Sequence, residues 1–109
     1  YANYLKYFER ARTEFLRERG YPLLDHMGKE IGIIVVRAEV DYKSPARYDD
    51  LLDVTTRVSE IANASFTMEQ TVLRKRDRKL LASGVIKLAC IKNGRPTRIP
   101  DSLLEILRE

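Results

Sequence analysis

The first part of the chain carries apolar residues at the spacing of an amphipathic helix. Over residues 2–18, apolar side chains recur three or four positions apart, and charged side chains fill most of the remaining positions. The side-chain oxygen of Asn3 can cap the start of this helix, and Gly20 with the nearby Pro22 can end it. We therefore predict one long helix here, followed by a short connection over residues 23–29.

The two-residue alternation that is typical of β-strands replaces the helical spacing after residue 30. It predicts four strands: residues 31–42, a second strand with Leu52, Val54, Thr56 and Val58 on one face, a third that starts at Phe66, and a fourth over residues 80–92. The fourth strand is nearly apolar on both faces, so we expect it to be central and covered. Pro100 and Asp101 then open a short helix over residues 102–108.

One long helix followed by four long strands predicts a single α+β domain over residues 1–109. Long strands curl, so we expect a curved antiparallel sheet that wraps the helix. A chain of 109 residues with 44% hydrophobic residues can form a real core without disulfides or metal. One helix covers only one face of the sheet, and the other face and the edges need cover. We therefore expect self-association, as a dimer or a tetramer.

The composition excludes several classes of protein. Cys90 is the only cysteine and His26 the only histidine, so there is no zinc-ligand spacing, no Cys–His dyad and no Ser-His-Asp triad. We expect neither a metal nor another cofactor, and we expect His26 in a solvated loop and Cys90 as a small buried side chain. The lone cysteine, the lack of an apolar run near the ~20 residues that span a bilayer and the lack of a signal-peptide pattern predict a cytoplasmic protein without membrane insertion.

Four segments of the chain resemble hotdog-fold acyl-CoA thioesterases. They are residues 1–16 (YANYLKYFERARTEFL), 65–70 (SFTMEQ), 80–84 (LLASG) and 94–100 (GRPTRIP). Their order and separations resemble the branch that includes the 4-hydroxybenzoyl-CoA thioesterases and the bacterial thioesterases encoded beside the Tol-Pal system. The resemblance implies the hotdog fold, a long helix wrapped by a curved antiparallel sheet, and hydrolysis of the coenzyme A thioester of a small or medium acyl group.

The resemblance also implies the catalytic groups. It places a catalytic aspartate, as base or nucleophile, about seven residues before Tyr1, outside this chain. The first strand of the family's sheet would lie there too, and we expect the natural protein to contain both. Tyr1 aligns just before the helix, and its backbone N–H is the candidate oxyanion donor, because helix N-terminal amides are free and carry partial positive charge.

Further residues are candidates for substrate binding. They are Asn3 and Tyr4 at the helix start, Phe8, Phe66 and Met68 as walls of the acyl pocket, and Arg74, Lys75 and Arg76 for the phosphates of coenzyme A. The run 74–79 has five positive charges in six residues, and its alternative role is that of a solvated hairpin tip. The helix start could likewise be an ordinary capped end. Glu9 is either a second carboxylate of the site or the partner of Arg12 or Thr13 one turn along.

Two classes of function stay open at this point. The first is an acyl-CoA thioesterase, and the alternative is a non-catalytic acyl-CoA-binding hotdog protein. The net charge of +4 favours anionic partners. Nucleic-acid binding is disfavoured, because the aromatic residues belong mainly to the predicted helix and the apolar strand faces instead of alternating with basic residues.

Overall fold

The computed structural model describes residues 4–21 and 31–109 of the chain. The elements are α1 (Tyr4–Glu18), β1 (Ile31–Tyr42), β2 (Leu52–Ile61), β3 (Ser65–Arg74), β4 (Leu80–Lys92), β5 (Arg95–Pro96) and α2 (Asp101–Leu107). The long helix, the four strands and the terminal helix are confirmed, and the two-residue strand β5 is an addition. The predicted Asn3 cap, the connection over 23–29 and the loop position of His26 lie outside the described residues.

The strands form one antiparallel sheet in the order β1-β4-β3-β2, with β5 paired to β4. The predicted central position of β4 is confirmed, since β1 and β3 flank it. Its predicted cover on both faces is wrong for the described residues. The side chains of β4 alternate between buried and exposed, and Val85 on the outer face is 45% exposed. The helices lie against the other face only.

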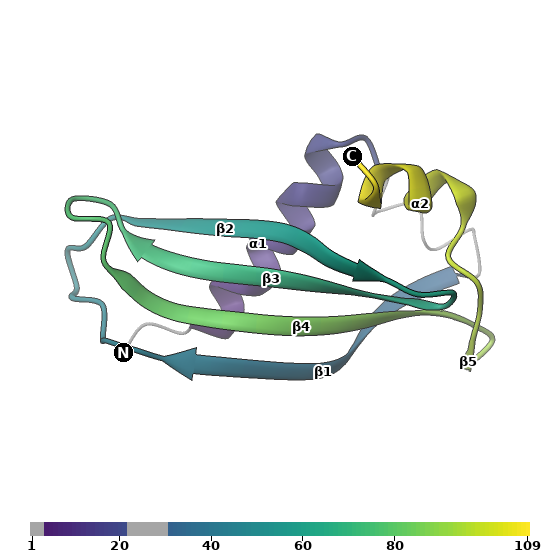
Figure 1. The fold of residues 1–109 in the computed structure, drawn as a ribbon, viewed down its shortest axis with the longest axis horizontal. Helices are drawn as coiled ribbons and strands as arrows, with labels where there is room; N and C mark the ends of the chain where they lie inside the picture. The colour runs from purple at the N-terminus through teal and green to yellow at the C-terminus, as the bar shows by residue number, and fades with distance from the viewer. Residues whose placement is uncertain (1–3, 22–30) are drawn as a thin grey trace.

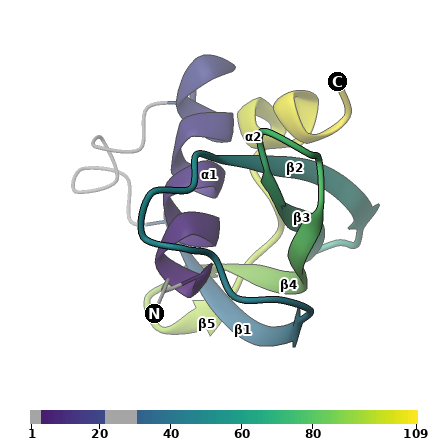
Figure 2. The ribbon, with the colours of Figure 1, turned by 90° about the vertical axis from the view of Figure 1, so that its left-hand side faces the viewer.

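The sheet curves around α1, as predicted, and α2 packs beside it on the same side (Figures 1 and 2). Two buried clusters fill the space between the layers. One joins Leu16 of α1 to α2 and to Phe66 and Met68 of β3. The other joins Tyr4 and Phe8 of α1 to Val72, Leu81 and Ala82. The start of α1 therefore lies toward the β3–β4 hairpin, and its end lies toward α2.

Both outer strands of the sheet have an edge that no described strand pairs. The pairing of β1 with β4 shifts register between Val35 and Arg37, so that Val36 is one extra residue in β1. Ile34, Val35 and Val36 are 43%, 46% and 50% exposed, which leaves an apolar strip along β1. None of the helices in the two described ranges combines the length and the apolar character needed to cross a membrane.

Candidate active site

The start of α1 is fixed by the side chain of Tyr4. This residue is 4% exposed, its hydroxyl donates a hydrogen bond to the carbonyl oxygen of Ser44 at 3.0 Å, and its ring stacks on that of Tyr42 with centroids 5.7 Å apart. Burial raises the pKa of the Tyr4 hydroxyl, so it stays a neutral donor. Tyr4 thus ties the segment after β1 to the helix start. Its contact with substrate stays a prediction.

One turn further, Phe8 lies directly against the sheet at Gly84. A Cβ atom on Gly84 would lie 3.0 Å from Cε2 of Phe8, closer than side chains normally approach. Only a glycine at this position of β4 therefore lets the helix come so near the sheet. Phe8 is fully buried here and so belongs to the hydrophobic core. Its role in the wall of an acyl pocket stays a prediction.

A buried amide on β3 joins the helix to two strands. The amide nitrogen of Gln70 donates hydrogen bonds to the carbonyl oxygen of Phe8 at 2.9 Å and to Oγ1 of Thr56 on β2 at 3.0 Å. Its amide oxygen accepts a hydrogen bond from Arg12 at 2.9 Å. Gln70 is not among the site residues predicted from the sequence. The available signal was one polar residue in the row Phe66, Met68, Gln70 and Val72, which is otherwise the apolar face of the strand.

Phe66 and Met68 on the same face of β3 are 1% and 0% exposed. Both belong to the cluster that joins the end of α1 to α2. Both side chains therefore pack in the hydrophobic core, and their contact with an acyl group stays a prediction. Cys90, in the same cluster, is fully buried as expected, and burial raises the pKa of its thiol.

The three basic residues predicted to bind phosphates differ in their surroundings. Arg74 has only 10% of its side chain exposed and forms ion pairs with Asp50 at 3.2 Å and Asp77 at 3.1 Å. The side chain of Lys75 is 58% exposed and lies 3.7 Å from Asp53. Arg76 is exposed and lines a shallow hollow with Lys75, Leu51 and two aspartates. The geometry of Arg74 favours a role in holding the hairpin to the loop before β2.

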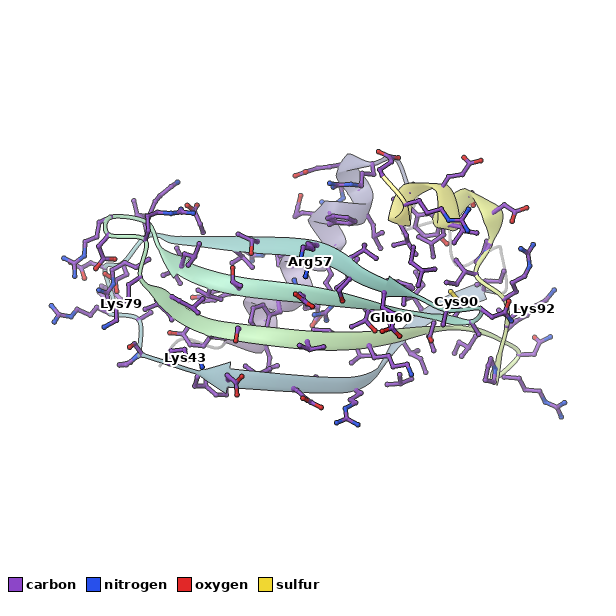
Figure 3. The ribbon with its side chains drawn as sticks, viewed as in Figure 1. Lys43, Arg57, Glu60, Lys79, Cys90 and Lys92 are labelled. Atoms are coloured by element: carbon purple, nitrogen blue, oxygen red, sulfur yellow. The ribbon has the colours of Figure 1, made fainter. Side chains whose placement is uncertain are left out.

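The carboxylates around Arg74 are held in the charged form. A hydrogen bond from the backbone N–H of Arg47 lowers the pKa of Asp50, and one from the backbone N–H of Lys79 lowers that of Asp77. The charge of Arg74 lowers both further. Figure 3 places Lys79 at one end of the sheet and Lys92 at the opposite end. The first turn of α1 lies toward the end of the sheet that carries the β3–β4 hairpin (Figure 1).

An open groove of about 390 Å³ runs between α1 and the strands β1 and β4. Its lining residues are Glu9, Arg12, Thr13, Leu16, Ile33, Val35 and Leu88. Glu9 is exposed, and in the described part of the chain it forms no ion pair with Arg12. Tyr1 and Asn3, the other candidates at the helix start, lie outside the described residues. Within residues 4–21 and 31–109, no three His, Cys, Asp or Glu side chains gather as a metal site would require.

Solved structures have the same arrangement of helix and sheet. A protein from Aquifex aeolicus of known crystal structure superposes with a TM-score of 0.89 at 33% identity, over 96% of this chain and 82% of that one. A 1,4-dihydroxy-2-naphthoyl-CoA thioesterase from Synechocystis superposes with a TM-score of 0.93 at 18% identity, over 100% of this chain and 82% of that one. The second likeness concerns the fold alone.

The sequence has close relatives among curated proteins. It is 32% identical over 109 residues to a putative esterase of Aquifex aeolicus, and the aligned region covers 100% of this chain and 84% of that protein. It is 37% identical over 108 residues to an acyl-CoA thioesterase, YbgC, of Haemophilus influenzae, and the aligned region covers 94% of this chain and 76% of that protein. A family model described as the Thioesterase-like superfamily matches residues 1–107. The chain therefore belongs to the Thioesterase-like superfamily and has its hotdog fold.

Proposed function

We propose that this protein hydrolyses the thioester bond of a small or medium acyl-CoA, within the branch of the 4-hydroxybenzoyl-CoA and Tol-Pal-associated thioesterases. The observation that carries the proposal is the family match over residues 1–107, together with a 37% identical relative named as an acyl-CoA thioesterase. We expect a cytoplasmic enzyme that uses no cofactor.

The proposed chemistry uses the helix start and a carboxylate upstream of Tyr1. The carboxylate attacks the thioester carbonyl carbon, or it removes a proton from a water that does so. Negative charge then develops on the carbonyl oxygen, and the backbone N–H of Tyr1 stabilises it. The carbon–sulfur bond breaks, and coenzyme A leaves as a thiolate. If the carboxylate acts as a base, the acyl group is released as the acid and the thiolate takes the proton that the water lost. If the carboxylate acts as the nucleophile, the acyl group stays on it as a mixed anhydride, which a water hydrolyses to the acid and the free carboxylate, with a proton of that water going to the thiolate.

The packing of α1 supports this use of its first turn. Tyr4 fixes the helix start to the segment after β1, and Phe8 is held by Gly84 and Gln70. Such contacts hold the helix amides in place before the substrate arrives, and preorganised donors are the ones that stabilise a developing oxyanion.

The hairpin between β3 and β4 offers charge for the other end of coenzyme A. Lys75 and Arg76 are exposed there, and the hairpin lies at the end of the sheet where α1 starts. We propose that these two residues contact the phosphates. Arg74, whose charge is balanced by two aspartates, holds the hairpin in shape.

The apolar strip on β1 supports the proposed self-association. Three neighbouring apolar residues at an unpaired strand edge favour pairing with a second copy of the chain. We propose a dimer, or a dimer of dimers, in which the helix of one subunit and the sheet of its partner enclose the acyl group.

The direct test is an assay of coenzyme A thiol release from aromatic, short-chain and long-chain acyl-CoAs, with a chelator present. Hydrolysis of at least one member is expected. If none is hydrolysed but acyl-CoAs bind, the alternative of a non-catalytic acyl-CoA-binding protein takes its place.

A further inference from the structure

Asp50 is a buried carboxylate that the predicted site residues do not include. Its side chain is 5% exposed, and its Oδ2 atom accepts hydrogen bonds from the backbone N–H of Arg47 at 2.7 Å and from Nε of Arg74 at 3.2 Å. The side chain of Arg74 is only 10% exposed and also pairs with Asp77. Charged groups that are removed from water in this way need partners of opposite charge. Asp50 and Arg74 therefore link the loop before β2 firmly to the β3–β4 hairpin.

Asp50 also closes a tight turn within the loop that joins β1 to β2, residues 43–51. Its backbone N–H donates to the carbonyl oxygen of Arg47 at 3.1 Å, and its side chain accepts from the N–H of the same residue. At the end of the loop, the carbonyl oxygen of Leu51 accepts a hydrogen bond from the backbone N–H of Lys75 at 2.8 Å. The second half of the loop is thus held to the hairpin, beside which it lies at one end of the sheet (Figure 1).

The first half of the same loop holds the start of α1. The backbone N–H groups of Lys43 and Ser44 both donate to the carbonyl oxygen of Leu81 on β4, at 2.8 and 3.1 Å. The carbonyl oxygen of Ser44 accepts a hydrogen bond from the hydroxyl of Tyr4 at 3.0 Å, and Ala46 packs against the buried cluster that contains Tyr4. The loop therefore connects the hairpin to the helix start, where the proposed function places the thioester.

Few contacts determine the path of this loop. It contains neither helix nor strand, and Arg47, Tyr48 and Asp49 in its middle are exposed. The carboxylate of Asp50, which binds both the turn and the hairpin, therefore sets the path of the chain between Ser44 and β2. This path matters for catalysis, because groups that act on a reacting bond must be held within about 0.5 Å of the productive geometry. A misplacement of about 1 Å can lower the rate about a hundredfold.

We propose that Asp50 is a positioning residue for thioester hydrolysis. It holds the loop 43–51 in the path in which Ser44 accepts from Tyr4, and Tyr4, three residues after the proposed oxyanion donor Tyr1, then fixes the helix start. The inference rests on the proposed function and adds to it a residue that touches neither the substrate nor the reacting atoms. Such a role differs from a role in stability alone, because it acts on kcat through the hydroxyl of Tyr4.

The test measures hydrolysis of a truncated pantetheine thioester by the protein extended upstream of Tyr1, as the proposed mechanism requires. This substrate lacks the adenosine phosphates, so a change in phosphate binding at the hairpin does not affect the result. Asp50→Ala is expected to lower kcat about tenfold and to change KM by less than about twofold. In a Tyr4→Phe protein, the same substitution is expected to lower kcat by less than about twofold, because the hydrogen bond through which it acts is already absent.

Asp77→Ala is the matched control. Asp77 also accepts from one backbone N–H and pairs with Arg74, but it lies in the hairpin and not in the loop. Its removal is expected to leave kcat within about twofold. Asp50→Asn keeps an oxygen that can accept from Arg47 but loses the charge, so a smaller fall in kcat is expected, and it replaces Asp50→Ala if that protein does not fold. Equal falls for the Asp50 and Asp77 variants, or an undiminished fall in the Tyr4→Phe protein, would overturn the inference.

Hydrogen exchange separates failure of this inference from failure of the proposed function. Backbone amides in the first two turns of α1, residues 4–11, are expected to exchange about tenfold faster in Asp50→Ala than in the unaltered protein, and at the same rate in Asp77→Ala. Amides of residues 66–72 on β3 are the internal reference. If no thioester is hydrolysed but exchange changes in this way, the proposed function is wrong and the role of Asp50 in fixing the helix start is supported. Unchanged exchange in α1 would contradict that role.

Discussion

At the scale of single residues, Gln70 shows how one buried amide can hold a helix to two strands. It is 0% exposed and makes three hydrogen bonds, to α1 twice and to β2 once. No buried side-chain polar atom in the described part of the chain lacks a partner. A buried group of this kind contributes modestly while it is satisfied, and its loss is costly because its partners are left unpaired.

Replacement of Gln70 by leucine is therefore expected to destabilise the protein by about 2 kcal/mol. The change leaves Arg12 without its acceptor and removes a tie between α1 and β2. Denaturant unfolding measures the effect. Glu69→Gln is the control, since Glu69 lies on the opposite face in an exposed pair with Arg57, where a change under about 1 kcal/mol is expected. Equal losses of stability in the two variants would show that the hydrogen bonds of Gln70 contribute no more to the free energy of unfolding than the exposed ion pair of Glu69.

The basic hairpin leads to a prediction about substrate binding. Neutralising Lys75 and Arg76 together, as Lys75→Gln and Arg76→Gln, is expected to raise KM for acyl-CoA and to weaken its dependence on salt. Activity on a truncated pantetheine thioester, which lacks the adenosine phosphates, is expected to stay the same. Steady-state kinetics on both substrates measures the effect.

Arg74→Gln serves as the contrasting variant for that experiment. It breaks two ion pairs of a nearly buried side chain, so it is expected to lower stability and to affect both substrates alike. If the double variant also impairs both substrates alike, the hairpin acts through folding and the proposed phosphate contact is wrong.

At the scale of elements, the helix and the strands could be predicted because their apolar positions repeat over many residues. The alternation along β3 was sufficient, since buried residues alternate there with half-buried ones. The nearly apolar run of β4 predicted the strand and its central position, but not that one of its faces is partly exposed. The links between elements could not be predicted. Gln70 meets Arg12 and Phe8 only after α1 crosses the sheet, and Arg74 meets Asp50 only through the packing of the hairpin on the loop before β2. Such contacts depend on register and crossing angle, which no local pattern contains.

The closest approach of α1 to the sheet gives a prediction at this scale. In Gly84→Ala the added Cβ meets the ring of Phe8 at 3.0 Å, so the helix or the ring must shift, at a cost of about 1–3 kcal/mol. The shift also moves the helix start, so a fall in kcat is expected. Denaturant unfolding and the hydrolysis assay measure the two effects.

Gly32→Ala is the matched control for Gly84→Ala. A Cβ on Gly32 would lie 3.6 Å from Cγ1 of Ile91, an ordinary contact, so stability and kcat are expected to change little. A stable and fully active Gly84→Ala protein would show that the helix does not depend on this close approach.

At the scale of the whole molecule, the exposed apolar strip on β1 predicts association in solution. Sedimentation at micromolar concentration is expected to show a dimer or a larger species, and Val36→Lys, which places a charge in the strip, is expected to shift the protein toward monomers. Lys87→Glu is a control on the outer face of β4, where Lys87 is already exposed. A stable monomer of the unaltered protein at that concentration would remove the dimer and the shared acyl pocket together.

The last prediction concerns the catalytic carboxylate, which joins the fold to the reaction. The helix start supplies donors for the oxyanion, but attack on the thioester needs a base or a nucleophile as well. The protein extended upstream of Tyr1 is expected to carry an aspartate about seven residues before it, and Asp→Asn there is expected to lower kcat by about two to four orders of magnitude. Acyl-CoA binding is expected to persist, because the carboxylate acts on the transition state more than on the bound substrate.

Turnover and calorimetric binding, measured on the two forms with a chelator present, separate these effects. Equal turnover by both forms would contradict the proposed mechanism. A loss of binding along with turnover would mean that the carboxylate helps to hold the substrate.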